Sequence, residues 1–111
     1  MMRKIAANYL FFPGHALVKN GYVEFISSQE MRIVDTEGQL RDLAGLEFYG
    51  GMLVPDYICE YTQQFREKVG LLPLLEKIFK MRGERFEKMA IIEGADLIRL
   101  EWTEQTTVRL L

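Results

Sequence analysis

The chain has 111 residues, of which 49% are hydrophobic and 27% charged, and its formal net charge is −2. A chain of this length buries roughly 60 to 70% of its unfolded surface, which is enough for one core without disulfide or metal staples. We therefore predict a single domain over residues 1–111. Lys and Arg are interspersed with Asp and Glu, so the clustered positive surface needed for nucleic-acid binding is not expected.

Cys59 is the only cysteine, which excludes an intramolecular disulfide and a thiolate-rich zinc site and fits a reducing compartment. The N-terminus has the positive start of a signal peptide, but Asn8 interrupts its short apolar stretch and Pro13 with Gly14 ends it. No uninterrupted apolar run approaches the roughly 20 residues of a membrane span. We predict a cytoplasmic protein that contacts neither a membrane nor nucleic acid.

The first half of the chain is rich in branched and aromatic residues separated by turn signals, which predicts strands. Residues 5–12 end at the turn signal Pro13-Gly14, and Asn20-Gly21 favours a tight hairpin turn between residues 16–18 and 22–26. Further strands are predicted at residues 31–34, 46–49 and 52–54, with a polar turn at 35–38 and a turn or bulge at Gly50-Gly51. This makes about five strands within residues 1–58.

The hydrophobic period becomes helical after Ile58, over residues 62–82. Proline is tolerated in the first turn of a helix and glycine favours its end, so Pro73 and Gly83 predict a helix over residues 72–82. A shorter helix is expected to end near Gly70, and residues 84–89 are compatible with another turn. The helical segment thus covers residues 60–90.

The tail, residues 91–111, returns to strand patterns at residues 96–102 and 106–111. The predicted fold is α+β and mainly β. We expect a small β-sandwich or pseudo-barrel of about seven strands, five from the first half and two from the tail, packed with one or two helices.

Several segments resemble the small composite β-domain of the metal-dependent amidohydrolases, a superfamily that includes imidazolonepropionase, cytosine deaminase and chlorohydrolases. Residues 3–9 look like its opening strand, residues 19–24 like its "NG-V" hairpin, and residues 33–35 like the strand that follows. Leu53-Val54-Pro55 is similar to the "G-LVPGFVN" strand that enters the catalytic barrel. Residues 94–101, Gly-Ala-Asp-Leu-Ile-Arg-Leu-Glu, are similar to the "G-x-ADLVLLD" strand that returns from it.

The sequence is too short to contain the catalytic barrel itself. A (β/α)8 barrel needs about 250 residues, with 200 near the lower limit. In the family the barrel-entry strand ends in a His-x-His pair that binds the metal. The resemblance places Asp56 where the family has glycine, and Tyr61 and Gln63 where it has the two histidines. Neither replacement is a good ligand for a catalytic divalent ion, so we expect a degenerate metal site, no metal and no other cofactor.

No catalytic residue is predicted. His15 follows a turn signal, and no Ser or Cys partner is identifiable, so a surface or turn position is expected. Cys59 could be a nucleophile, but nothing nearby would lower its pKa, and a small buried or half-buried side chain is the expected role. Asp56 and Glu60 could form an acid–base pair, although helix capping or a solvent-facing position is the expectation.

The amphipathic helix carries an apolar stripe formed by Leu71, Leu75, Ile78 and Phe79. Such a stripe is usually core, but we keep it as a candidate interaction surface. In the resembled family the small domain presses one side against the barrel, and a free-standing copy must repolarise or cover that side. A homodimer or another protein partner is therefore expected.

Three functions remain open at this point. The leading hypothesis is a non-catalytic, stand-alone relative of the amidohydrolase small domain that acts as a structural or protein-interaction module. A second is a hydrolase of carbon–nitrogen bonds that a separate barrel subunit completes. The third is a small-ligand-binding domain with its pocket between the helix and the sheet.

Overall fold

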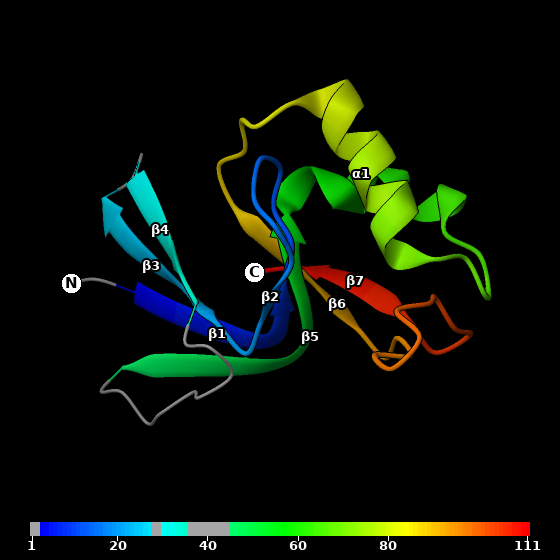
Figure 1. Ribbon diagram of the computed structural model, residues 1–111, viewed down its shortest axis with the longest axis horizontal. Helices are drawn as coiled ribbons and strands as arrows, with labels where there is room; N and C mark the ends of the chain where they lie inside the picture. Colours follow the sequence, from blue (N-terminus) through cyan, green and yellow to red (C-terminus); the bar gives the residue numbers. More distant parts are fainter. Residues whose placement is uncertain (1–2, 28–29, 36–44) are drawn as a thin grey trace.

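A computed structural model describes residues 3–27, 30–35 and 45–111. Within these residues, seven strands form one mixed sheet in the order β4-β3-β1-β5-β6-β7, with β2 pairing β1 as well, and two helical segments complete the fold (Figure 1). The predicted α+β class is confirmed, with five strands before residue 58 and two in the tail. The elements are β1 Arg3–Leu10, β2 Val18–Lys19, β3 Tyr22–Ser27, β4 Glu30–Val34, β5 Leu46–Pro55, η1 Asp56–Gln64, α1 Leu71–Arg82, β6 Met89–Glu93 and β7 Thr107–Leu110.

The predicted hairpin at Asn20-Gly21 is wrong. β2 and β3 both run antiparallel to β1 and in one register, with Tyr9 opposite Lys19 and Ala6 opposite Tyr22. Asn20 adopts a positive φ of 57°, and its N–H still donates to the Asn8 carbonyl at 2.8 Å. The Asn-Gly pair therefore interrupts one long strand. The reversal lies at the other predicted turn, Pro13-Gly14.

β5 is a single ten-residue strand with a bulge at Gly50-Gly51. Its pairing with β1 advances from Ala7–Tyr49 to Tyr9–Met52, so β5 contains one extra residue there. The Gly51 N–H donates to the Asn8 Oδ1 atom at 2.8 Å. Because Gly51 has a φ of 133° and lies against the Ile92 carbonyl, this position requires glycine. The two strands predicted on either side of the glycines are thus one strand. The polar turn predicted at 35–38 falls, apart from Asp35, outside the described residues.

The helix predicted at the end of the helical segment is confirmed within one residue. α1 has Pro73 in its first turn, and Gly83 closes it with a φ of 80° and an N–H donated to the Phe79 carbonyl at 2.7 Å. The shorter helix expected to end near Gly70 is not formed. The 3-10 helix η1 ends at Gln64, and the extended backbone of Phe65 places its ring on Trp102, 4.9 Å between centroids.

The strand predicted at residues 96–102 is wrong. The Asp96 Oδ1 atom accepts hydrogen bonds from the N–H groups of Ile98 and Arg99, both at 3.0 Å, which folds the segment into a turn. The first strand of this part of the chain is instead β6, Met89–Glu93, which overlaps the predicted further turn only at Met89. β6 contains the short apolar run Met-Ala-Ile-Ile. Because both faces of this strand are buried, its sequence lacks the apolar–polar alternation of a half-exposed strand.

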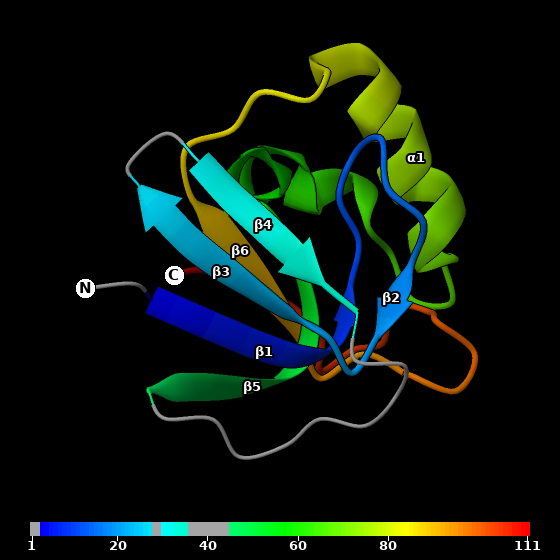
Figure 2. The same ribbon diagram turned by 60° about the vertical axis from the view of Figure 1, so that its left-hand side comes forward.

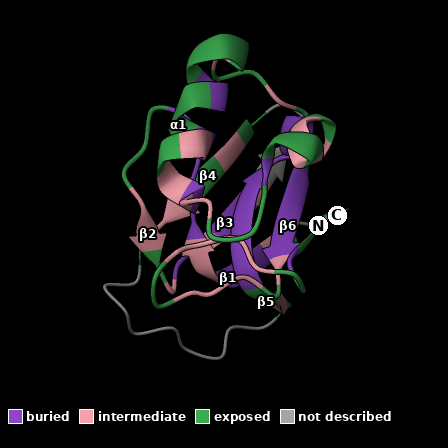
Figure 3. Cartoon of the chain, turned by 90° about the vertical axis from the view of Figure 1, so that its right-hand side faces the viewer, coloured by how far each residue is buried: buried purple, intermediate pink, exposed green. Residues whose placement is uncertain are grey.

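The core has two parts, one on each face of the β5–β6 pair. Met52, Val54, Ala90 and Ile92 face α1 and η1, whereas Leu53, Met89 and Ile91 face β1 and β3. The sheet curls so that β4, β3 and β1 enclose the second part, as the two ribbon views show (Figures 1 and 2). Figure 3 shows the buried strands in purple beneath the largely exposed outer face of α1. In the described parts of the chain, no helix is long and apolar enough to cross a membrane.

Candidate functional site

The segment Leu53-Val54-Pro55 ends the strand β5. The sheet stops at Pro55, and η1 begins at Asp56. Pro55 fixes an extended residue with φ −60° and ψ 151° directly before the helix. Tyr57 and Ile58 are consequently buried side chains of η1 and belong to the core on the helical side.

Tyr61 and Gln63, the two positions that the resemblance aligns with metal-binding histidines, both lie on η1. A 3-10 helix has three residues per turn, so side chains two residues apart point about 120° apart around its axis. The Tyr61 hydroxyl accepts a hydrogen bond from Arg82 Nη1 at 3.4 Å, while Gln63 is exposed. The two members of a His-x-His pair on a strand project from the same side, and the two side chains on η1 therefore do not.

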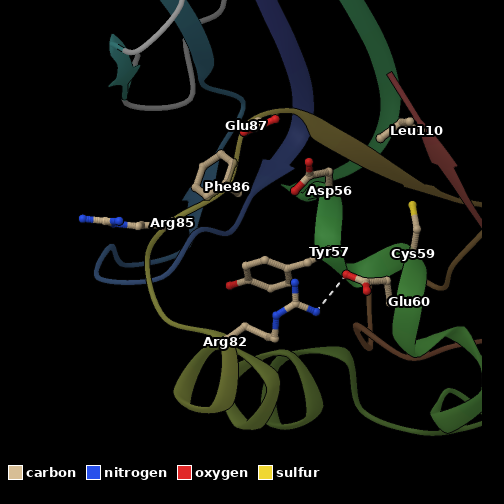
Figure 4. A pocket seen from close by; sticks show the side chains of 9 residues that line it. All are labelled: Asp56, Tyr57, Cys59, Glu60, Arg82, Arg85, Phe86, Glu87 and Leu110. Atoms are coloured by element: carbon tan, nitrogen blue, oxygen red, sulfur yellow. Dashed lines mark hydrogen bonds and ion pairs between the residues drawn. The ribbon is translucent and has the colours of Figure 1, made fainter.

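Arg82, at the end of α1, occupies the centre of a shallow depression beside η1. Arg82 Nη1 donates to Glu60 Oε2 at 2.8 Å, and the guanidinium carbon lies 4.9 Å from the centre of the Tyr57 ring (Figure 4). The depression has a volume of about 430 Å³ and is lined by Asp56, Tyr57, Cys59, Glu60, Arg82, Arg85, Phe86, Glu87 and Leu110. Hydrogen bonds to Tyr61 and Glu60 raise the pKa of Arg82 further above its ordinary value, so it stays a cation.

The other polar groups of the depression hold the chain after α1 in place. The Tyr57 hydroxyl donates to the Gly83 carbonyl at 3.0 Å. Asp56 Oδ2 accepts from the Lys88 N–H at 3.2 Å, and the Asp56 N–H donates to the Lys88 carbonyl at 3.0 Å. These contacts connect η1 with both ends of the segment that joins α1 to β6.

Neither proton donor of the depression is activated for chemistry. Burial raises the pKa of Tyr57 to about 12, because the phenolate would lose solvation, and the Arg82 charge offsets only part of this effect. Burial also raises the pKa of the half-buried Cys59 thiol, and the negative charge of Asp56 adds to the shift. A nucleophilic thiolate requires the opposite environment, with a lowered pKa.

The acid–base pair considered for Asp56 and Glu60 is not formed. Asp56 binds backbone at the start of η1 without capping it, since no side-chain cap bond is present at the helix end. Glu60, whose side chain is 62% exposed, faces solvent and pairs with Arg82. Within residues 3–27, 30–35 and 45–111, no group of three or more His, Cys, Asp or Glu side chains could hold a metal ion.

The apolar stripe of α1 is core in the structure. Leu71, Leu75 and Ile78 are completely buried, and Phe79 is 8% exposed. The prediction of an interaction surface at these four positions is therefore corrected, because the four side chains already pack on the sheet and η1. The ligand-binding hypothesis, with a pocket between helix and sheet, stays a prediction. His15 is exposed, and its N–H closes the turn by donating to the Phe12 carbonyl at 3.1 Å.

Arg82 is the site residue that the sequence analysis did not single out. A basic residue in the last turn of a helix is favoured by the helix dipole, and this signal is present in Lys80 and Arg82. Its partner Glu60 lies 22 positions earlier, and no local pattern connects the two. Only the packing of η1 against the end of α1 brings them together.

Comparison with known proteins gives no relative from which a function could be transferred. No family model matches the chain. No curated protein and no solved structure matches it at a significant level.

Proposed function

We propose that this protein is a non-catalytic, stand-alone relative of the amidohydrolase small β-domain and that it serves as a structural or protein-interaction module in the cytoplasm. The relation to that domain is supported by the five strands formed within the first 58 residues, of which the last ends in Leu53-Val54-Pro55. The return strand that the resemblance implied at residues 94–101 is a turn here, so the support comes from the N-terminal half.

The observation that carries the non-catalytic role is the use of three polar side chains of η1, those of Asp56, Tyr57 and Glu60, for structural contacts. Glu60 is paired with Arg82, Tyr57 holds Gly83, and Asp56 holds Lys88. The Cys59 pKa is raised, which keeps its thiol protonated near neutral pH. A catalytic site requires groups that are free to touch a substrate, with pKa values near the working pH.

An interaction role is supported by incomplete pairing in the sheet. On one side of β5, β1 pairs along most of the strand. On the other side of β5, β6 pairs only with residues 52–55. The first half of β5 also exposes 54% of Phe48. An unpaired strand carrying an exposed aromatic side chain is a recognised site of association between chains.

Metal content and hydrolysis test the non-catalytic role. The purified chain should contain less than stoichiometric zinc, nickel, iron or manganese after exposure to each ion, and should not hydrolyse carbon–nitrogen bonds. One equivalent of a metal whose removal by a chelator abolishes hydrolysis would contradict the proposal and would favour the hydrolase hypothesis.

A matched variant sharpens this test. Tyr61→His with Gln63→His restores the two histidines of the family pattern at exposed or half-buried positions. Because η1 points them apart, the double variant should retain no more metal than the parent chain after desalting. Tight stoichiometric binding by the variant would show that this segment can form the strand geometry of a metal centre.

A further inference from the structure

The first half of β5 offers an unpaired strand edge. Residues 46–49 pair with β1, and no strand among the described residues pairs with their other side, because β6 begins its pairing at Met52. We call the outward side of residues 46–50 the β5 edge. Figure 1 shows this half of β5 extending along the margin of the sheet, away from β6 and β7. Within the described residues, no strand takes up the backbone groups that face outward there.

Phe48 is the central residue of this edge and is 54% exposed. It lies opposite Ala6, so its side chain is on the face of the sheet that does not contribute to the core around Ile5 and Ala7. Among the described residues, three other large hydrophobic side chains are exposed, those of Met81 on α1, Ile98 in a turn and Leu110 on β7. Burying an exposed aromatic ring is among the largest apolar gains that a surface residue can contribute.

The β5 edge carries little of the charge that usually prevents strand association, and it ends at the bulge of Gly50-Gly51. Residues 46–50 contain neither lysine nor proline, and the single charge, Glu47, is neutralised by Arg3 through contacts of 2.7 and 3.1 Å. That ion pair also lowers the pKa of Glu47. The outer strand β4 carries two charged side chains, Glu30 and Arg32, of which Arg32 pairs with Glu24 at 2.7 Å. The β5 edge has a single charge, which favours pairing.

We infer that the β5 edge binds the same edge of a second copy of this chain, as an antiparallel pair around a two-fold axis at Phe48. This inference rests on the proposed interaction role and names its partner and surface. The pair places Phe48 opposite Phe48, Glu47 opposite Tyr49, and Leu46 opposite Gly50. The sheet of one copy, through its strands β4, β3, β1 and β5, then joins the same four strands of the other copy in one continuous sheet.

The sequence of the edge is complementary to itself in this arrangement. The two Phe48 rings form an aromatic cross-strand pair, which is stabilising. The Tyr49 hydroxyl, which already donates to its own Glu47 at 3.3 Å, comes opposite the carboxylate of the partner. No like charges face each other. The same operation on β4 would place Arg32 directly opposite Arg32, which is destabilising.

The pairing surface is small, and this determines the strength of the dimer. A five-residue strand pair with one central aromatic contact falls in the class below about 1,200 Å² of total buried surface, which is typical of transient complexes. We therefore expect a dimer that dissociates on dilution.

Light scattering after size exclusion tests this inference with two matched variants. The parent chain should shift with concentration from 13.0 kDa towards twice that mass. Phe48→Lys places two cations opposite each other and should weaken dimerisation at least about tenfold. Ile98→Lys changes a residue that is 95% exposed in a turn and should leave dimerisation unchanged. Circular dichroism checks that both variants fold.

Cysteine cross-linking locates the axis. In a Cys59→Ser background, Phe48→Cys places two thiols directly opposite each other, with Cβ atoms about 4.5 to 5.5 Å apart in an antiparallel pair. Mild oxidation should give a covalent dimer faster than it does for Ile98→Cys in the same background. Equal rates for the two variants would overturn the pairing at Phe48.

The outcomes separate this inference from the proposed function. A parent dimer that persists in Phe48→Lys would overturn the β5 edge and leave an interaction module that uses another surface. A parent chain that is monomeric at every concentration would overturn the self-association. Catalytic metal binding overturns the non-catalytic role whatever the oligomeric state.

Discussion

The two halves of β5 are parts of one strand with opposite environments. Residues 52–54 are completely buried, lie between β1 and β6, and contact core on both faces. Residues 46–49 pair with β1 alone among the described strands, and residues 46–50 are all half-buried or exposed. The two halves differ in what packs around them.

The bulge at Gly51 separates these environments. One extra residue increases the local twist and bends the strand, so the second half can follow β6 while the first half stays with β1. The Asn8 side chain supplies the hydrogen bond that the ladder loses at this point. The contrast teaches that a single backbone position can divide one strand into a core segment and an edge.

Substitution of Gly51 should have the largest effect on this division. Gly51→Ala places a Cβ atom against the Ile92 carbonyl oxygen at a positive φ, so we expect a loss of about 3 to 5 kcal/mol in the free energy of unfolding from strain and clash together. Gly50→Ala is the matched control, because its nearest neighbour would be Asn8 Oδ1 at 3.9 Å. Urea denaturation of both variants measures the difference in the free energy of unfolding. Equal losses of stability in the two variants would show that the bulge does not require glycine at position 51 in particular.

Truncation in the buried half should be the next largest effect. Leu53 is completely buried, so Leu53→Ala should cost about 3 kcal/mol through lost burial and an unfilled cavity. Urea unfolding monitored by circular dichroism gives the value. A cost below about 1 kcal/mol would mean that this half of β5 is not core.

Truncation in the exposed half should affect stability much less. Phe48→Ala removes a ring that is 54% exposed in the single chain, and we expect less than about 1 kcal/mol when unfolding is measured at concentrations where the chain is monomeric. If the cost matches that of Leu53→Ala under these conditions, the two halves do not differ as described.

The smallest effect concerns Cys59 in η1, which continues the buried half. Because burial and Asp56 raise the thiol pKa, the thiolate fraction is lower in the folded chain than in the unfolded chain at slightly alkaline pH. Alkylation should therefore be slower in the native protein than in urea, and the native rate should keep rising at higher pH. An equal or faster native rate would identify an activated thiol and reopen a catalytic role.

The sequence was informative where local chemistry decides the structure. Pro73 and Gly83 located α1, and the Gly-Gly pair marked the bulge. It misled where a motif has two solutions: Asn20-Gly21 can close a hairpin or interrupt a continuous strand, and the pairing of Lys19 and Tyr22 with β1 decides. The turn at Asp96 replaced a predicted strand because one side chain satisfies two backbone N–H groups.

The candidate site was less predictable than the fold. The contact of Arg82 with Glu60 and the unpaired side of β5 both depend on how distant segments pack. A pattern of apolar residues also could not reveal that Leu71 and Leu75 are covered within the chain while Phe48 is not. Burial of this kind is a property of the tertiary structure.

Residue-resolved hydrogen exchange at low and high protein concentration tests the central claim, that one half of β5 is core and the other an association edge. The account predicts slow exchange of the amides of residues 52–54 at both concentrations. In residues 46–50, the amides that point away from β1 should exchange rapidly in dilute protein and become protected in concentrated protein. Exchange in residues 46–50 that does not depend on concentration would contradict the account.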